Sequence, residues 1–162
     1  MLFFNRKLLF LAVSVSAAQG ALAFAQPRPD FSGTWKQDNA RSAAGAGSTL
    51  QYSNRIDHKD GAITVTTISR GGHRKDSNVT RTYTTNGKPI MYKASDGDDL
   101  TTTVNWEGKA LVFENIEKRP KETITIRETW VLSEDGKTLT KRRHSSGPQG
   151  QNDQTYVLEK QN

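Results

Sequence analysis

The sequence is dominated by a regular alternation of short β-prone segments and glycine turns. Segments rich in threonine, valine and isoleucine are separated by the pairs Asp60-Gly61, Asn86-Gly87, Asp96-Gly97 and Asp135-Gly136. Such pairs supply the positive φ angles of tight hairpin turns, so strands that are adjacent in sequence should be antiparallel neighbours in space. No segment carries the 3.6-residue apolar repeat of an amphipathic helix. The pattern predicts an all-β chain.

The same pattern predicts ten strands in an antiparallel up-and-down meander. Their expected ranges are 31–37, 50–57, 62–69, 79–85, 89–94, 100–106, 110–117, 123–133, 138–145 and 154–160. Such a meander either exposes two strand edges or closes on itself. Closure into a lipocalin-like β-barrel of about 8–10 strands satisfies the edges. An eight-stranded sandwich is the alternative architecture.

The first 25 residues have the organisation of a secretory signal peptide. Arg6 and Lys7 form a basic start, residues 8–18 form an apolar stretch too short to span a bilayer, and Ala23-Phe24-Ala25 matches a small-x-small cleavage site. Cleavage would leave residues 26–162 as a single domain, exported to the periplasm or secreted, with no stable membrane insertion. An uncleaved membrane anchor is the alternative.

Composition and motifs narrow the classes of function. The chain has no cysteine, which excludes disulfides and a lipoprotein anchor. It carries 23 Lys and Arg against 17 Asp and Glu, but the excess is spread along the chain and does not cluster with the aromatic residues. The three histidines lack metal-ligand spacing, and the sequence shows no nucleophile elbow and no nucleic-acid-binding motif. We therefore expect no cofactor, no metal site and no nucleic-acid partner.

The heptapeptide Asp30–Lys36 (DFSGTWK) opens the first expected strand. Phe31, Gly33 and Trp35 alternate, so they share one face of an extended chain. The glycine allows a close approach of the backbone on that face, and a buried indole N–H needs a hydrogen-bond acceptor. An ordinary core tryptophan on an ordinary strand would give the same pattern.

The motif Phe31-x-Gly33-Thr34-Trp35-Lys36 resembles the opening strand of the calycins, the superfamily of the lipocalins and the cytosolic fatty-acid-binding proteins. In these proteins a basic residue from the last strand lies over the tryptophan of a Gly-x-Trp motif. The segment 155–160 is similar to the closing strand of the fatty-acid-binding proteins, so the resemblance implies that Lys160 covers Trp35. It implies a single calycin-like barrel over residues 26–162, closed by Gly33, Trp35 and Lys160.

A calycin-like barrel implies a non-catalytic, monomeric protein that holds one small apolar or amphipathic molecule. Alternation along the strands places five residues on the more apolar faces, and we expect them to contact the ligand together with one arginine. The expected ligand-binding residues are Trp106, Phe113, Arg127, Trp130, Tyr156 and Leu158.

The last strand departs from the fatty-acid-binding proteins, many of which hold the ligand carboxylate with an Arg-x-Tyr pair. The matching positions here are Tyr156 and Leu158. A buried carboxylate without a compensating charge is costly. The resemblance therefore predicts a neutral ligand, unless Arg127 or Arg143 turns inward and supplies the charge.

Glu128 shares the apolar face of its strand with Ile126 and Trp130, which would place a carboxylate inside the barrel or at its rim. A bulge that turns Glu128 into solvent is the alternative. Candidates to pair with Glu128 or to meet an anionic ligand are Arg127, Lys141, Arg142 and Arg143, although such residues more often belong to a solvated sheet face.

Two other functions are compatible with the sequence. One is a cell-envelope interaction or inhibitor protein, which would use a loop such as 145–153 on a filled barrel. The other is an enzyme on the same scaffold, such as an isomerase or hydrolase, which would need a convergent set of polar groups inside the barrel, for example Glu128 with a histidine.

Overall fold

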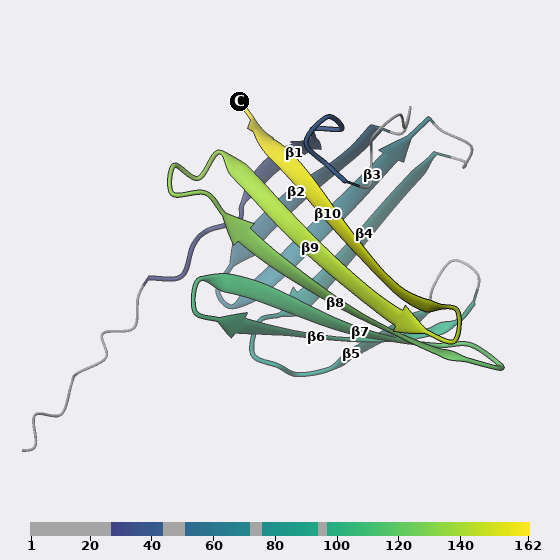
Figure 1. Ribbon diagram of the computed structural model, residues 1–162. Coiled ribbons are helices and arrows are strands. Elements are labelled where there is room, and N and C mark those ends of the chain that lie inside the picture. Colours follow the sequence, from purple (N-terminus) through teal and green to yellow (C-terminus); the bar gives the residue numbers. More distant parts are fainter. Residues whose placement is uncertain (1–26, 44–50, 72–75, 94–96) are drawn as a thin grey trace, which may run out of the picture.

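The computed structural model describes residues 27–43, 51–71, 76–93 and 97–162, which form ten strands in one antiparallel sheet (Figure 1). The expected signal peptide, residues 1–25, lies outside the described residues. All ten predicted strands are present. They are β1 (Gly33–Gln37), β2 (Gln51–Lys59), β3 (Ala62–Arg70), β4 (Ser77–Thr84), β5 (Ile90–Lys93), β6 (Asp99–Glu107), β7 (Ala110–Lys118), β8 (Thr123–Leu132), β9 (Thr138–Gly147) and β10 (Gly150–Gln161).

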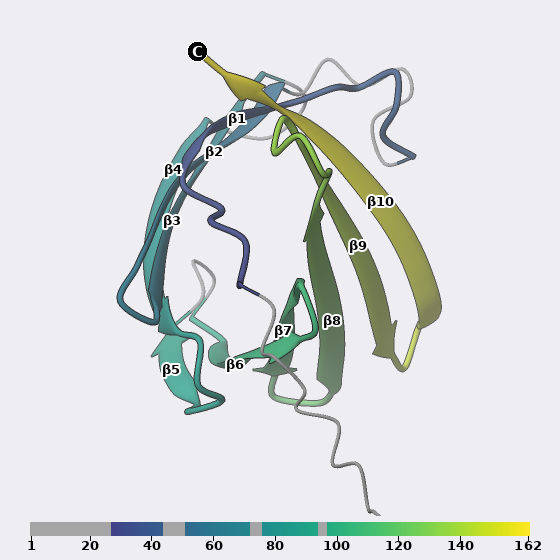
Figure 2. The same ribbon diagram turned by 90° about the vertical axis from the view of Figure 1, so that its left-hand side faces the viewer.

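The sheet curls into a nearly closed barrel. Its strand order is β4-β3-β2-β1-β10-β9-β8-β7-β6-β5, so the first and last strands of the chain pair in the middle of the sheet. Figure 2 shows the wall of β1–β4 facing the wall of β8–β10, with β5–β7 joining them at one side. The two end strands of the sheet, β4 and β5, complete the ring without pairing with each other, so the hairpin predicted at Asn86-Gly87 is wrong. The predicted all-β meander barrel is confirmed, and the sandwich is wrong.

The turns explain why the strand positions could be read from the sequence. Asp60 and Gly61 both have positive φ, 52° and 77°, and they join Lys59 to its register partner Ala62. This is the conformation that Asp-Gly favours in a two-residue hairpin.

The predicted boundaries differ most from the structure at the start of the last strand, which was expected at residue 154 and begins at Gly150. Residues 145–153 were expected to form a loop, but β9 and β10 stay paired from Leu158 opposite Leu139 to Gly150 opposite Gly147. Gly150 has a φ of 108°, which lets the chain reverse over two residues. The polar run 151–153 reads as loop, yet it is paired strand, because cross-strand hydrogen bonding overrides the low strand propensity of its side chains.

One end of the barrel interior is filled with side chains. Phe31, Trp35, Leu111, Leu139 and Leu158 are all fully buried there and belong to one hydrophobic cluster. Burial of each such side chain stabilises the fold by about 1.5–3 kcal/mol. The packed end fixes the positions of the strands, and the inward-facing residues further along β2–β9 surround a cavity.

Candidate functional site

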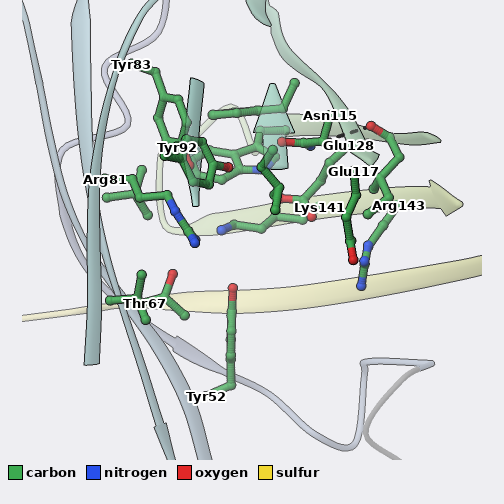
Figure 3. Close-up of a pocket in the computed structure, with 16 residues that line it drawn as sticks. Tyr52, Thr67, Arg81, Tyr83, Tyr92, Asn115, Glu117, Glu128, Lys141 and Arg143 are labelled. Atoms are coloured by element: carbon green, nitrogen blue, oxygen red, sulfur yellow. Dashed lines mark hydrogen bonds between the residues drawn. The ribbon is translucent and has the colours of Figure 1, made fainter. Parts of the chain in front are cut away.

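A cavity of about 260 Å³ lies inside the barrel, beyond the packed end (Figure 3). Its wall combines apolar and aromatic groups with ionisable side chains. The apolar and aromatic part includes Val65, Tyr83, Tyr92, Phe113, Ile126 and Trp130, and the polar part includes Tyr52, Arg81, Asn115, Glu117, Glu128, Lys141 and Arg143. A ligand that has both an apolar body and a polar group would match this lining.

The aromatic rings form a continuous, packed surface on one side of the cavity. The Phe113 ring lies 4.4 Å from the Trp130 ring and 5.4 Å from the Tyr83 ring, centroid to centroid, and the Tyr83 contact is edge-on at 87°. Tyr83 in turn meets Tyr92 in an edge-on contact at 6.4 Å. Rings that brace one another in this way present a rigid apolar surface to a ligand.

Lys141 brings a buried cation to the same space, over the face of the Trp130 ring. It lies on β9 and is only 2% exposed. Its ammonium donates a hydrogen bond to Asn54 Oδ1, and its Nζ lies 3.6 Å from the centroid of the Trp130 ring. Burial lowers the pKa of Lys141 to about 8, and the negative charge of Glu128 partly opposes this shift.

Two arginines add permanent positive charge to the cavity wall. The guanidinium carbon of Arg81 lies 4.3 Å from the centroid of the Tyr92 ring, and Arg143 Nη1 donates to Gln154 Oε1 at 3.4 Å. Arg143 lies two residues beyond Lys141 on β9, so both side chains face inward. Arginine stays charged at any physiological pH, so these groups favour a negative partner.

The two carboxylates of the lining are each engaged. Glu117 forms an ion pair of 2.7 Å with Arg119, and Glu128 accepts a hydrogen bond from Trp130 Nε1. Glu128 therefore lines the cavity, on the face that alternation along its strand indicated, and is not turned out by a bulge. With Glu117 held by Arg119, three cationic side chains face the cavity against one remaining carboxylate.

Tyr52 closes the cavity beside Lys141. Its ring stacks on that of Tyr156 at 6.0 Å, and its hydroxyl accepts a hydrogen bond from Asn54 Nδ2 at 3.5 Å. Burial raises the pKa of Tyr52 to about 12, with a smaller contribution from the charge of Glu128. The phenol is thus a neutral hydroxyl at physiological pH.

The structure brings only part of the expected ligand-binding set to the cavity. Phe113 and Trp130 line it. Tyr156 lies behind Tyr52 and donates its hydroxyl to Gln154 Oε1. Leu158 is fully buried in the hydrophobic cluster at the packed end.

Trp106 and Arg127 lie elsewhere. Trp106 faces inward at the packed end, where its ring contacts Phe31 at 6.0 Å and His58 at 5.6 Å. Arg127 is on the outer face of β8, with ion pairs to Glu107 and Glu114. Arg127 points outward because it shares a face of β8 with Thr125 and Thr129, whereas the next residue, Glu128, is on the inward face.

The sequence-based set omitted Arg81 and the tyrosines Tyr52, Tyr83 and Tyr92. The sequence did contain a signal for Arg81, because it lies two residues from both Val79 and Tyr83 on β4 and so shares their inward face. Among residues 27–43, 51–71, 76–93 and 97–162, no group of three metal-ligating side chains occurs. No helix in these ranges is long and apolar enough to cross a membrane.

Solved structures with this barrel are numerous. A zebrafish ileal bile acid-binding protein complexed with cholic acid superposes with a TM-score of 0.58 at 18% identity, covering 81% of this chain and 98% of that one. The fold is that of the calycins. A Schistosoma mansoni fatty acid binding protein in complex with arachidonic acid superposes on this calycin barrel with a TM-score of 0.52 at 16% identity, covering 82% of this chain and 96% of the other.

Some proteins that share this barrel have names that mention no ligand. Secretory abundant heat soluble protein 4 from Ramazzottius varieornatus superposes with a TM-score of 0.59 at 12% identity, covering 82% of this chain and 95% of that chain. No protein-family model and no curated protein matches the sequence. At these identities the likeness establishes a calycin-like fold alone, and the cavity is the feature of this chain that bears on function.

Proposed function

We propose that this chain is an exported, non-catalytic binding protein that holds one small amphipathic molecule inside its barrel. The cavity supplies the two halves of such a site, an aromatic surface around Phe113 and Trp130 and a polar side around Lys141. Bile-acid-binding and fatty-acid-binding proteins are among the proteins that share the fold, which supports a binding function over a catalytic one.

The observation that carries the ligand class is the convergence of Arg81, Lys141 and Arg143 on one cavity. The sequence-based expectation of a neutral ligand held only if no arginine turned inward, and Arg143 lines the cavity. A carboxylate there would meet two permanent cations and a buried ammonium, which offset the cost of removing it from water. We therefore propose that the ligand is an amphipathic acid. Cholic and arachidonic acids, bound by two proteins of this fold, are amphipathic acids.

A displacement titration tests this proposal. The protein without residues 1–25 is loaded with a fluorescent fatty acid and titrated with decanoic acid and, in parallel, with decan-1-ol, which has the same chain and no charge. We expect both to displace the probe and the acid to do so at lower concentration. Equal or better displacement by the alcohol would contradict the acid preference. Displacement by neither would favour the interaction or inhibitor protein instead.

Export is proposed from Arg6-Lys7, the apolar stretch and the Ala23-Phe24-Ala25 site. Expression of the full chain in a bacterial host, followed by N-terminal sequencing of the protein recovered outside the cytoplasm, should give Gln26 as the first residue. A product that keeps Met1 and stays in the cytoplasm would contradict the proposal.

A further inference from the structure

We propose that Lys141 is a covalent capture site, whose side-chain amine forms a reversible imine with an aldehyde bound in the cavity. The inference rests on the proposed function in one respect, because it uses the same cavity and the same aromatic surface. It goes further in naming a second ligand class, medium-chain aldehydes, and the atom to which they bind.

The first support is the position of the amine. Lys141 is the one lysine that is buried among the residues the structure describes, and it lines the cavity. Figure 3 shows Lys141 and Arg81 directed toward the middle of the cavity from facing walls. An aldehyde whose chain lies on the ring of Phe113 would carry its carbonyl group into this region.

The second support is the chemical state of that amine. Burial lowers the pKa of Lys141 to about 8, so a useful fraction is the neutral, nucleophilic amine near neutral pH. Recognition of an anion does not require this property, because Arg81 and Arg143 already supply cations that cannot lose their protons. Lysine offers what neither arginine can, an unprotonated nitrogen with a free electron pair.

The reaction balances without an oxidant or a cofactor. The neutral amine attacks the carbonyl carbon, a C–N bond forms, and a proton moves from nitrogen to oxygen to give a carbinolamine. Protonation of its hydroxyl and loss of water then leave a protonated imine. Overall, one ammonium and one aldehyde give one protonated imine and one water, so the positive charge at this position is kept.

The surroundings of Nζ suit the product as well as the starting amine. A protonated imine retains a single N–H, and Asn54 Oδ1 is placed to accept it. Its cation would remain over the face of the Trp130 ring, at the place where Nζ lies 3.6 Å from the centroid. The charge of Glu128, which opposes loss of the ammonium proton, also favours a cationic product.

Reductive trapping tests the proposal. The protein without residues 1–25 is mixed with an equimolar amount of decanal at pH 7, reduced with sodium borohydride and mapped by peptide mass spectrometry. An ordinary exposed lysine holds far less neutral amine at pH 7 than one with a pKa of about 8. We therefore expect the decyl adduct at Lys141 to exceed that at the exposed hairpin residue Lys109 by on the order of tenfold or more. Label spread over exposed lysines, with Lys141 unmodified, would overturn the proposal.

Matched variants separate the imine from simple binding. Lys141→Arg keeps the cation and removes the nucleophile, so the adduct at this site should be lost, whereas Lys109→Arg should leave it unchanged. Mapping of the unmutated protein decides the question even if Lys141→Arg does not fold. Decan-1-ol and decanoic acid are also titrated into the same protein preparation loaded with the fluorescent fatty acid. If they displace this probe but decanal is not trapped at Lys141, the imine alone is refuted. If neither displaces the probe and decanal is not trapped, the proposed function is refuted too.

Discussion

Lys160 Nζ lies 5.3 Å from the centroid of the Trp35 ring, and the two residues are register partners across β1 and β10. Trp35 is fully buried, and its Nε1 donates to the backbone oxygen of Phe31 at 2.9 Å. The first and last strands of the chain are therefore joined at an indole ring whose N–H is hydrogen-bonded and whose face is covered by a cation. This contact fixes the pairing that brings the two walls of the barrel together.

The two residues should contribute very unequally to stability. Loss of a buried tryptophan costs about 3–5 kcal/mol, whereas a cation over an indole contributes about 0.5–1 kcal/mol at an exposed position. Trp35→Ala should thus unfold or nearly unfold the domain, and Lys160→Ala should lower the free energy of unfolding only modestly. Urea denaturation followed by tryptophan fluorescence measures both. Similar losses in the two variants would contradict this division.

Gly33 should be intolerant of a side chain for two reasons. Its φ is +139°, where other residues are strained, and a Cβ at this position would lie 2.7 Å from Lys160 Cε. We expect Gly33→Ala to cost about 1–3 kcal/mol of the free energy of unfolding. In Gly33→Ala with Lys160→Ala the steric part is removed, so the combined loss should be smaller than the sum of the single losses. Simple additivity would show that backbone strain alone is responsible.

The architecture could be predicted because its signals are local. The Asp-Gly pairs at 60–61 and 135–136 mark hairpins, and alternation assigns the faces of β7 and β8 correctly, with Phe113 and Trp130 inside. Asn86-Gly87 is an exception, because it joins β4 to β5, which do not pair. The start of β10 was missed because residues 151–153 owe their strand conformation to pairing with β9 and not to their own propensities.

The cavity was harder to predict because alternation gives a side of the sheet but no height along the barrel. Trp106 faces inward as expected, yet it lies among the side chains of the packed end. The reverse holds for Arg143, for which a solvated sheet face was the alternative because charged residues usually face solvent, and for Arg81, which the sequence-based set omitted. Which inward positions border open space depends on the register of all ten strands, and no single strand carries that information.

Stability should rise with pH above 8 because of Lys141. Its pKa is about 8 in the folded state against 10.5 as the ordinary value, so between these values the unfolded chain binds more protons and the folded state gains stability as pH rises. The gain is about 3 kcal/mol at most. Lys141→Met should abolish most of this rise and be more stable than the unmutated protein at pH 7. Chemical denaturation from pH 7 to 10 measures both effects, and an unchanged slope in the variant would exclude Lys141 as the cause.

Above pH 10 the trend should reverse because of Tyr52 and Tyr83. Burial raises the pKa of Tyr52 to about 12, and burial together with Tyr92 raises that of Tyr83, so both stay protonated in the fold while the unfolded chain loses these protons. The folded state then binds more protons, and stability falls as pH rises. Tyr52→Phe should flatten this decline. Absorbance at the phenolate band should show Tyr52 and Tyr83 ionising only as the protein unfolds.

Of the three arginines Arg127, Arg142 and Arg143 on β8 and β9, only Arg143 should affect ligand binding strongly. Arg143 lines the cavity, Arg142 faces the opposite side of the same strand, and Arg127 is held outside by Glu107 and Glu114. A hydrogen bond to a charged group is worth about 1.5–3 kcal/mol, so Arg143→Gln should weaken the binding of decanoic acid by roughly tenfold to a hundredfold.

The same substitution at the two outward-facing arginines provides the controls. Arg142→Gln and Arg127→Gln remove the same charge from the protein without changing the cavity, and both should leave the affinity for decanoic acid within about twofold because exposed charges act weakly at a distance. Decan-1-ol should bind all three variants alike. Isothermal titration of the acid and the alcohol into each variant gives the comparison. A loss of acid affinity that is the same at all three positions would mean that net charge, and not an inward arginine, attracts the acid.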